Sequence, residues 1–179
     1  MQTDSELLRL VGQGREESFL ALYRRHQGPV FRFALHMSGR VETAEEVVQE
    51  VFLSLLSHSH RFTETNGNLQ GYLIGMARNI VRAHLRQASR FLPENPAAAT
   101  ETAIVDSLTK EQDLRDLHSA ILSLPANYRE AVVLCDLEGL DYERAANHLD
   151  CPVGTVRSRL YRARALLTAK LKKRIRCSA

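Results

Sequence analysis

Apolar residues recur every three or four positions from one end of this chain to the other, and no segment alternates strictly between apolar and polar residues. The clearest stripe predicts one side of a helix that follows Thr43. Its members are Ala44, Val47, Val48, Val51, Phe52 and Leu55. Because the spacing is that of a helix and the alternation of a strand is missing, the pattern predicts an all-α fold.

Capping residues and a proline predict where the N-terminal helices begin. Thr3 with Glu6, and Thr43 with Glu46, have the spacing of a capping box, in which each side chain accepts a hydrogen bond from the other residue's backbone. Pro29 predicts a further helix start, because proline fits a first helical turn better than a helix interior.

A helix is also predicted from about Tyr72 to Gln87, with an apolar seam on which His84 falls. The inward residues of this seam are Leu73, Met76, Ala77, Ile80 and Val81. We expect His84 to be a packed histidine and not a ligand. The outer face carries arginines at four-residue steps, namely Arg78, Arg82, Arg86 and Arg90. Since residues 65–93 contain no Asp or Glu, these arginines favour a phosphate track over a solubilising face.

Residues 93–112 interrupt the helical periodicity. Pro, Ala, Thr and acidic residues replace the apolar stripe there, and the helical pattern resumes near Leu114. The chain is therefore expected to have three parts: a helical bundle over residues 1–92, a flexible acidic linker over 93–112, and a second helical bundle over 113–179.

The helix that begins near Thr155 has the sharpest division of faces. Its apolar seam is Val156, Leu160, Ala163 and Leu167. At 100° per residue the opposite face consists of Ser158, Tyr161, Arg162 and Ala165, with Arg157 and Arg164 flanking it on one side and Arg159 on the other. A short amphipathic stretch at 141–149 and a turn at 150–152 precede it. This order predicts a helix-turn-helix, whose second helix enters the major groove of DNA.

Charge is distributed unevenly along the chain. Residues 155–179 hold nine Lys or Arg and no Asp or Glu, whereas the whole chain has a net charge of +3, so residues 1–154 carry −6. This asymmetry suggests two kinds of partner, a polyanion and a protein.

The predicted helix after Thr43 has an acidic outer face. Its polar residues are Glu42, Glu45, Glu46, Gln49 and Glu50, and residues 41–57 contain no Lys or Arg. Such a face is either solvated or a docking surface for a basic protein, and the helical pattern alone favours the solvated face.

Motifs of catalysis and cofactor binding are missing from the sequence. No phosphate-binding glycine loop, nucleophile elbow or zinc-protease motif occurs, and His148 with Cys151 is too small a set to close a metal site. We therefore expect no enzyme activity, no metal and no cofactor. No apolar run is long enough to span a bilayer, no signal peptide is evident, and three unpaired cysteines suit a reducing cytoplasm.

Several stretches, taken in order, resemble one family. The string 43–52 (TAEEVVQEVF) resembles sigma factor region 2, and 73–80 (LIGMARNI) followed by His84 is similar to the helix that opens the −10 promoter element. Leu124-Pro125 with Arg129, followed by 150–164 (DCPVGTVRSRLYRAR), resembles sigma region 4. Their order and the chain length resemble the extracytoplasmic-function (ECF) sigma factors, which keep only regions 2 and 4.

The resemblance implies roles for particular residues. Region 4 would read the −35 element with Gly154, Thr155, Arg157, Ser158, Tyr161, Arg162 and Arg164, in which the backbone of Gly154 and Thr155 would donate to phosphate. Region 2 would capture the separated strand of the −10 element with Asn66, Asn68, Leu69, Arg78, Asn79, Arg82 and Arg86. Contacts to core RNA polymerase would come from Glu46, Gln49, Glu50 and Phe52.

The resemblance also implies partners. These are promoter DNA, core RNA polymerase through the β′ clamp coiled coil and the β flap, and an anti-sigma factor, often membrane-bound, that holds the protein inactive until an envelope or stress signal arrives. Two other classes share some of the residues. A repressor or activator would bind duplex DNA unaided, and a helical adaptor would use the basic tail on an acidic protein or a membrane.

Overall fold

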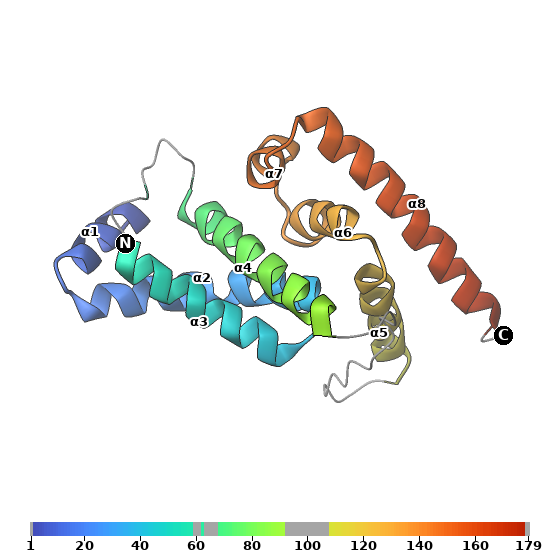
Figure 1. Cartoon of the computed structure of the whole chain (residues 1–179), viewed down its shortest axis with the longest axis horizontal. Coiled ribbons are helices and arrows are strands. Elements are labelled where there is room, and N and C mark those ends of the chain that lie inside the picture. The colour runs from blue at the N-terminus through green and yellow to red at the C-terminus, as the bar shows by residue number, and fades with distance from the viewer. Residues whose placement is uncertain (1, 59–61, 63–67, 92–107, 178–179) are drawn as a thin grey trace. The chain divides into compact units, whose positions relative to one another are not determined.

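The computed structural model describes residues 2–58, 62, 68–91 and 108–177, and every regular element in these ranges is helical (Figure 1). The all-α prediction is thus confirmed. The helices are α1 (Asp4–Gly12), α2 (Glu16–Ser38), α3 (Val41–His58), α4 (Leu69–Phe91), α5 (Leu108–Leu122), α6 (Ala126–Val132), α7 (Tyr142–Leu149) and α8 (Val153–Cys177). A π-helical stretch, Val133–Leu137, directly continues α6. Among the described helices, none combines the length and the apolar character needed to cross a lipid bilayer.

The chain divides into two compact units. Residues 1–35 and 40–94 form the N-terminal unit, and residues 95–179 with 36–39 form the C-terminal unit. The predicted linker falls mostly on residues outside the described ranges. Its last residues are helical, because α5 begins at Leu108 and not near Leu114 as the pattern predicted.

In the N-terminal unit, α3 buries the whole stripe that the sequence predicted. Further core side chains come from the other helices of this unit: Leu7, Leu8, Val11, Leu22, Val30, Phe33, Leu73, Ile74, Ala77 and Val81. His26 on α2 is only 4% exposed, and its Nε2 lies 2.9 Å from Oδ2 of Asp4 on α1. Burial lowers the pKa of this imidazole, and the Asp4 carboxylate opposes that effect.

Two predicted helix starts in this unit are wrong. Pro29 lies inside α2, whose apolar residues are buried on both sides of it, as Leu22 and Phe33 show. Each such burial contributes about 1.5–3 kcal/mol, which together offsets the roughly 3 kcal/mol that an interior proline costs. Thr43 does not cap α3 either, because that helix begins at Val41. The predicted capping box at Thr3 and Glu6 is confirmed, with both hydrogen bonds formed at the start of α1.

The C-terminal unit is built around α8. Helices α5, α6 and α7 all pack on α8. Of the predicted seam, Val156, Leu160 and Ala163 are buried, and Leu167 is only partly buried. Arg129 on α6 is partly buried and donates to the carbonyl oxygens of Leu122 and Leu124, the latter over 3.1 Å. These bonds satisfy carbonyls at the C-terminal end of α5 that have no partner within a helix. Burial lowers the pKa of the Arg129 guanidinium from its ordinary value.

Candidate functional site

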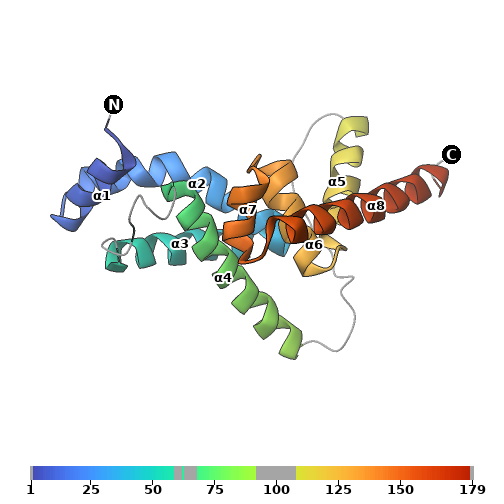
Figure 2. The ribbon, with the colours of Figure 1, turned by 90° about the horizontal axis from the view of Figure 1, so that it is seen from above.

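Helix α7, the turn after it and the start of α8 form the predicted helix-turn-helix. Asp141 caps α7, with its Oδ1 accepting from the backbone N–H of Arg144 at 2.7 Å. The helix ends at Asp150, whose φ of 50° is left-handed, and the N–H of Cys151 then donates to the carbonyl of Ala146. This turn redirects the chain into α8. Figure 2 shows α8 continuing as one helix from there toward the C-terminus.

One face of α8 is open to solvent. Arg157, Ser158 and Arg162 are exposed, and Tyr161 is 78% exposed. The buried seam lies opposite, so the division of faces that the sequence predicted is confirmed. Ser158 Oγ donates to the carbonyl of Thr155 at 2.9 Å, which fixes the hydroxyl near the start of the helix.

Gly154 and Thr155 lie in the first turn of α8 and differ in their surroundings. The N–H of Thr155 donates to the carbonyl of Pro152 at 2.8 Å, so the predicted backbone donation from Thr155 to a phosphate is wrong for this structure. Gly154 is exposed, and a Cβ added to it would meet no atom within 4 Å. A ligand therefore has open access to α8 at Gly154.

Two arginines of α8 are held by side chains from outside the helix. The Arg157 guanidinium lies over the Tyr142 ring, 5.7 Å from its centroid. Arg164 donates to Asp136 through two nitrogens, with Nη2 at 2.6 Å from Oδ1 and Nε at 3.1 Å from Oδ2. The hydrogen bonds and negative charge of Asp136 raise the pKa of Arg164. Sequence reasoning missed Asp136 and Tyr142, because no local spacing links them to α8.

Helix α4 carries the residues expected at the −10 element, and they divide into two groups. Asn79 and Arg86 are exposed, and Arg82 is half-buried. Asn68 is exposed at the start of α4, where its Oδ1 accepts from the N–H of Gly71 at 2.9 Å. Asn66 lies outside the described residues.

Two other expected contacts on α4 are buried, and their placement on the surface was wrong. Leu69 is 1% exposed and Arg78 is 9% exposed. The cause is a rotation of the buried seam relative to the predicted one. Ile74, which precedes Arg78 by about one helical turn, is fully buried, whereas the predicted inward residues Met76 and Ile80 are only partly so.

The outer face of α3 carries the expected polymerase contacts Glu46, Gln49 and Glu50, all exposed. Phe52 is not among them. Its side chain is 2% exposed and packs edge-on against the ring of Tyr23 at 4.8 Å between centroids, so its prediction as a surface contact was wrong. The exposed neighbour is Leu53, at 63%.

Leu53 and Leu56 extend the acidic face of α3 toward its C-terminal end. Leu56 is 44% exposed, and both leucines project on the same side as Glu46 and Gln49 at helical spacing. The sequence reasoning missed them because it followed only the polar residues of this face. We call Glu42, Glu46, Gln49, Glu50, Leu53 and Leu56 the α3 face.

His84 of α4 contacts the α3 face. Its Nε2 lies 2.8 Å from Oε1 of Glu50, and its Nδ1 lies 3.7 Å from Oε2 of Glu46. The imidazole is 27% exposed, so His84 packs against α3 at the edge of the core. This contact joins α3, which is expected to bind polymerase, to α4, which is expected to bind DNA.

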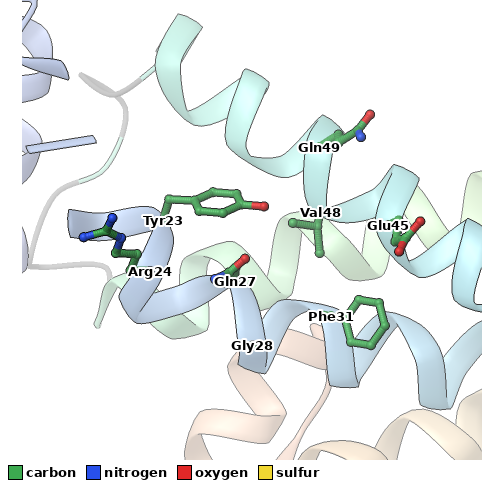
Figure 3. A pocket seen from close by; sticks show the side chains of 8 residues that line it. All are labelled: Tyr23, Arg24, Gln27, Gly28, Phe31, Glu45, Val48 and Gln49. Carbon is green, nitrogen blue, oxygen red and sulfur yellow. The ribbon is translucent and has the colours of Figure 1, made fainter. Parts of the chain in front are cut away.

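A cleft of about 540 Å³ opens beside the α3 face, between α2 and α3 (Figure 3). Tyr23 and Phe31 project from α2 into it, and Val48 lies between them on α3. Glu45 and Gln49 line the side formed by α3. Arg24 and Gln27 line the side formed by α2, so the cleft joins an apolar floor to a polar rim that holds one acidic and one basic side chain.

Other reactive groups are few in the described ranges. No three His, Cys, Asp or Glu side chains gather closely enough there to hold a metal ion. Cys135 and Cys151 are free thiols, and burial raises the pKa of Cys135 to about 11.

Known protein families match both units. Residues 22–91 match the family "Sigma-70 region 2", and residues 114–167 match "Sigma-70, region 4". The ECF RNA polymerase sigma factor SigE of Mycolicibacterium smegmatis is 34% identical over 167 residues, which cover 90% of this chain and 64% of that protein. The ECF RNA polymerase sigma-E factor of Escherichia coli K12 is 32% identical over 189 residues, which cover 97% of each chain.

A solved structure has the same fold. The sigma factor RpoE of Bartonella quintana, determined in complex with the anti-sigma factor NepR, superposes with a TM-score of 0.68 and 28% identity. The match covers 88% of this chain and 96% of that one. The helical architecture and the order of the two regions therefore agree with those of known sigma factors.

Proposed function

The chain belongs to the ECF RNA polymerase sigma factors of the sigma-70 family, and from this membership we propose how its surfaces divide the work of transcription initiation. Sigma factors are regulators of transcription and not enzymes. The protein binds core RNA polymerase in the cytoplasm and directs it to promoters that carry its −35 and −10 elements. It also helps to open the DNA for transcription initiation.

Helix α8 reads the −35 element in the major groove. The single observation that carries this assignment is the exposed face of Arg157, Ser158, Tyr161 and Arg162 opposite the buried residues Val156, Leu160 and Ala163. Arg162 can place a guanidinium against a guanine edge, and such a bidentate contact contributes about 1–3 kcal/mol of discrimination. Gly154 admits a phosphate to the start of the helix.

Helix α4 binds the separated strand of the −10 element. Asn79 offers an amide to an exposed base edge, and Arg82 and Arg86 bind the strand's phosphates. Asn68, at the exposed start of α4, contacts a base that has left the stack. Each base that leaves the duplex costs a few kcal/mol, and these contacts offset that cost.

The α3 face and the adjoining cleft bind the β′ clamp coiled coil of core polymerase. Glu46, Gln49 and Glu50 provide charge complementarity to a basic helix, whereas Leu53 and Leu56 provide apolar area. The C-terminal unit binds the β flap.

An anti-sigma factor covers these surfaces until a signal releases the protein. The support for this step is the similarity, at 28% identity, to a sigma factor determined in complex with its anti-sigma factor. An anti-sigma factor anchored in a membrane would couple release to an envelope signal, and stress is the class of signal that we propose.

Two variants test the division of work. Arg162→Ala should lower promoter-specific transcription roughly 5- to 150-fold, the equivalent of about 1–3 kcal/mol, and leave the affinity for core polymerase unchanged. Glu50→Lys should lower the affinity for core at least about tenfold, because it places a positive charge against a basic partner. Arg9→Ala and Glu17→Lys, at exposed positions of α1 and α2, are matched controls for the loss and reversal of charge.

Affinity for core is measured by fluorescence anisotropy of the labelled protein, and transcription by run-off synthesis at saturating protein. Equal loss of both activities in Arg162→Ala would contradict the assignment of α8. An unchanged affinity in Glu50→Lys would contradict the assignment of the α3 face.

A further inference from the structure

Four side chains meet where the π-helical stretch, the start of α7 and α8 adjoin. We call Asp136, Tyr142, Arg157 and Arg164 the recognition-helix cluster. Asp136 receives two hydrogen bonds from Arg164, at 2.6 and 3.1 Å, and Tyr142 lies under the guanidinium of Arg157. The electrostatic influence of Tyr142 also reaches Arg164. Two residues outside the recognition helix thus hold two of its arginines.

Arg157 and Arg164 stand on the same side of α8. They are seven residues apart, which at 100° per residue brings the second arginine back to within about 20° of the first. The side they share is the flank between the buried seam and the exposed face. Contacts on this flank therefore add to the buried seam in fixing the rotation of α8 about its own axis.

The bidentate bond makes Arg164 a poor phosphate ligand. One edge of its guanidinium already matches the two oxygens of Asp136, an arrangement that fixes the planar group in one orientation. A phosphate that bound this same edge would require the bond to break, and a phosphate at the remaining N–H groups, on Nη1 and Nη2, would lie close to the Asp136 carboxylate. Since the phosphate and the carboxylate are both negative, they would repel each other at this short distance. The Asp136–Arg164 pair is therefore better suited to remain intact on DNA.

Tyr142 acts on Arg157 in a different way. A free arginine side chain samples many rotamers, and part of that freedom is lost when it binds. Placing the guanidinium over an aromatic ring restricts those rotamers before DNA arrives. Tyr142 is 37% exposed, so the ring and the arginine stay at the surface where DNA would lie.

We propose that Asp136, through Arg164, and Tyr142, through Arg157, are positioning residues for −35 recognition, and that Arg164 does not contact DNA. The proposal rests on the proposed reading of the −35 element by α8. Asp136 and Arg164 fix the rotation of α8, and Tyr142 fixes the direction of Arg157.

The test uses holoenzyme assembled from the full chain and core polymerase. The probe is a labelled duplex enriched from random-sequence DNA by the unmodified holoenzyme. Its affinity is measured over a series of KCl concentrations. The charge-neutral double variant Asp136→Asn with Arg164→Gln should bind about three- to tenfold more weakly, an estimate from the coupling of half-exposed, bidentate charge pairs. Its slope of log affinity against log salt should equal that of the unmodified protein, because no phosphate contact is lost.

A charge swap provides the second arm. Asp136→Arg combined with Arg164→Asp restores an ion pair with the same net charge, and it should recover at least half of the binding free energy that the neutral pair loses. Tyr142→Phe keeps the ring and should bind as the unmodified protein does, whereas Tyr142→Leu should bind about threefold more weakly. Thermal melts followed by circular dichroism check that each variant is folded at the assay temperature.

A direct DNA contact by Arg164 would give different results. The neutral pair would then lower the salt slope by about 0.9, and the swap would place an aspartate against a phosphate and bind more weakly than the neutral pair. Either result overturns the positioning role, as does equal binding by Tyr142→Leu and Tyr142→Phe. Failure of the unmodified holoenzyme to select any duplex would instead contradict the proposed function of α8, so the two failures are distinguishable.

Discussion

Phe52 and Leu53 are adjacent in the sequence and have opposite environments, so they test the α3 face most sharply. Phe52 is 2% exposed and contacts the rings of Phe19 and Tyr23, at 6.1 and 4.8 Å between centroids. Leu53 is 63% exposed. Phe52 therefore contributes to stability, and Leu53 is expected to contribute to polymerase binding.

Phe52→Leu should lower stability without changing affinity for core. Each aromatic pair is worth about 0.5–1.5 kcal/mol, so the loss of two pairs costs about 1–3 kcal/mol. For a domain of this size, 1 kcal/mol shifts the melting temperature by about 4–8 °C, so the N-terminal unit should melt roughly 5–20 °C lower. At a temperature well below that transition, affinity for core should stay within about twofold.

Leu53→Ala should behave in the opposite way. Surface substitutions usually change stability by less than about 0.5 kcal/mol, so the melting temperature should move by only a few degrees. Covering an exposed leucine at an interface contributes about 1–2 kcal/mol, which predicts a 5- to 30-fold loss of affinity for core. Melting is followed by circular dichroism, and affinity by anisotropy of the labelled protein. The reasoning is refuted if Phe52→Leu melts normally but binds core tenfold more weakly, or if Leu53→Ala binds core normally.

Three further predictions follow from buried groups. Arg129→Ala should lower the free energy of unfolding of the C-terminal unit by about 2–4 kcal/mol, because the carbonyls of Met37, Leu122 and Leu124 lose their donor. A denaturant midpoint equal to that of the unmodified protein would contradict this. His26 has a lowered pKa in the folded state, so its contribution to stability is complete above its ordinary pKa of 6.5 and is lost as pH falls below that value through the folded pKa. His26→Gln should therefore reduce the fall in melting temperature between pH 7 and pH 5. An equal fall in both proteins would contradict the lowered pKa of His26. The pKa of Cys135 is about 11, compared with 9.0 for an ordinary thiol, which predicts about 100-fold less thiolate at pH 8. Alkylation of Cys135 by iodoacetamide, measured by mass spectrometry of the digested peptides, should be correspondingly slow. Alkylation as fast as that of a free thiol would contradict the raised pKa.

The buried faces of α3 and α8 were predictable because their burial is periodic over several turns. The stripe of α3 and the seam of α8 each place an apolar residue at nearly every third or fourth position, and their opposite faces are mostly polar. Local sequence therefore determines both the helix and its orientation. The strings that resemble regions 2 and 4 lie on these same helices and on α4, and the family assignment that they predicted is confirmed.

The predicted orientation was wrong for α4, where two neighbouring faces of the helix are apolar. In α4, both the predicted inward residues Met76 and Ile80 and the neighbouring Ile74 are apolar, so the periodicity fits two seams about one residue apart. Packing against α3 selects the seam with Ile74, and Arg78 is buried with it. The local sequence pattern does not show which of the two seams packs against a neighbouring helix.

Contacts distant in the sequence could not be predicted at all. Asp136 lies 28 residues before Arg164, and the helical spacing within α8 only indicated that this arginine was near the DNA-facing side. Pro29 failed for a related reason, since burial along α2 outweighs a local helix-breaking preference. In both cases tertiary contacts override the local signal.

The central claim is that this chain confers promoter selection on core RNA polymerase. The most direct measurement is run-off transcription with purified core enzyme on a pool of genomic DNA fragments, with the 5′ ends of the RNA mapped by sequencing. The account predicts initiation at discrete sites that share two upstream elements, only when the chain is present. Absence of such sites, together with tight and site-specific binding of duplex DNA by the chain alone, would contradict the account.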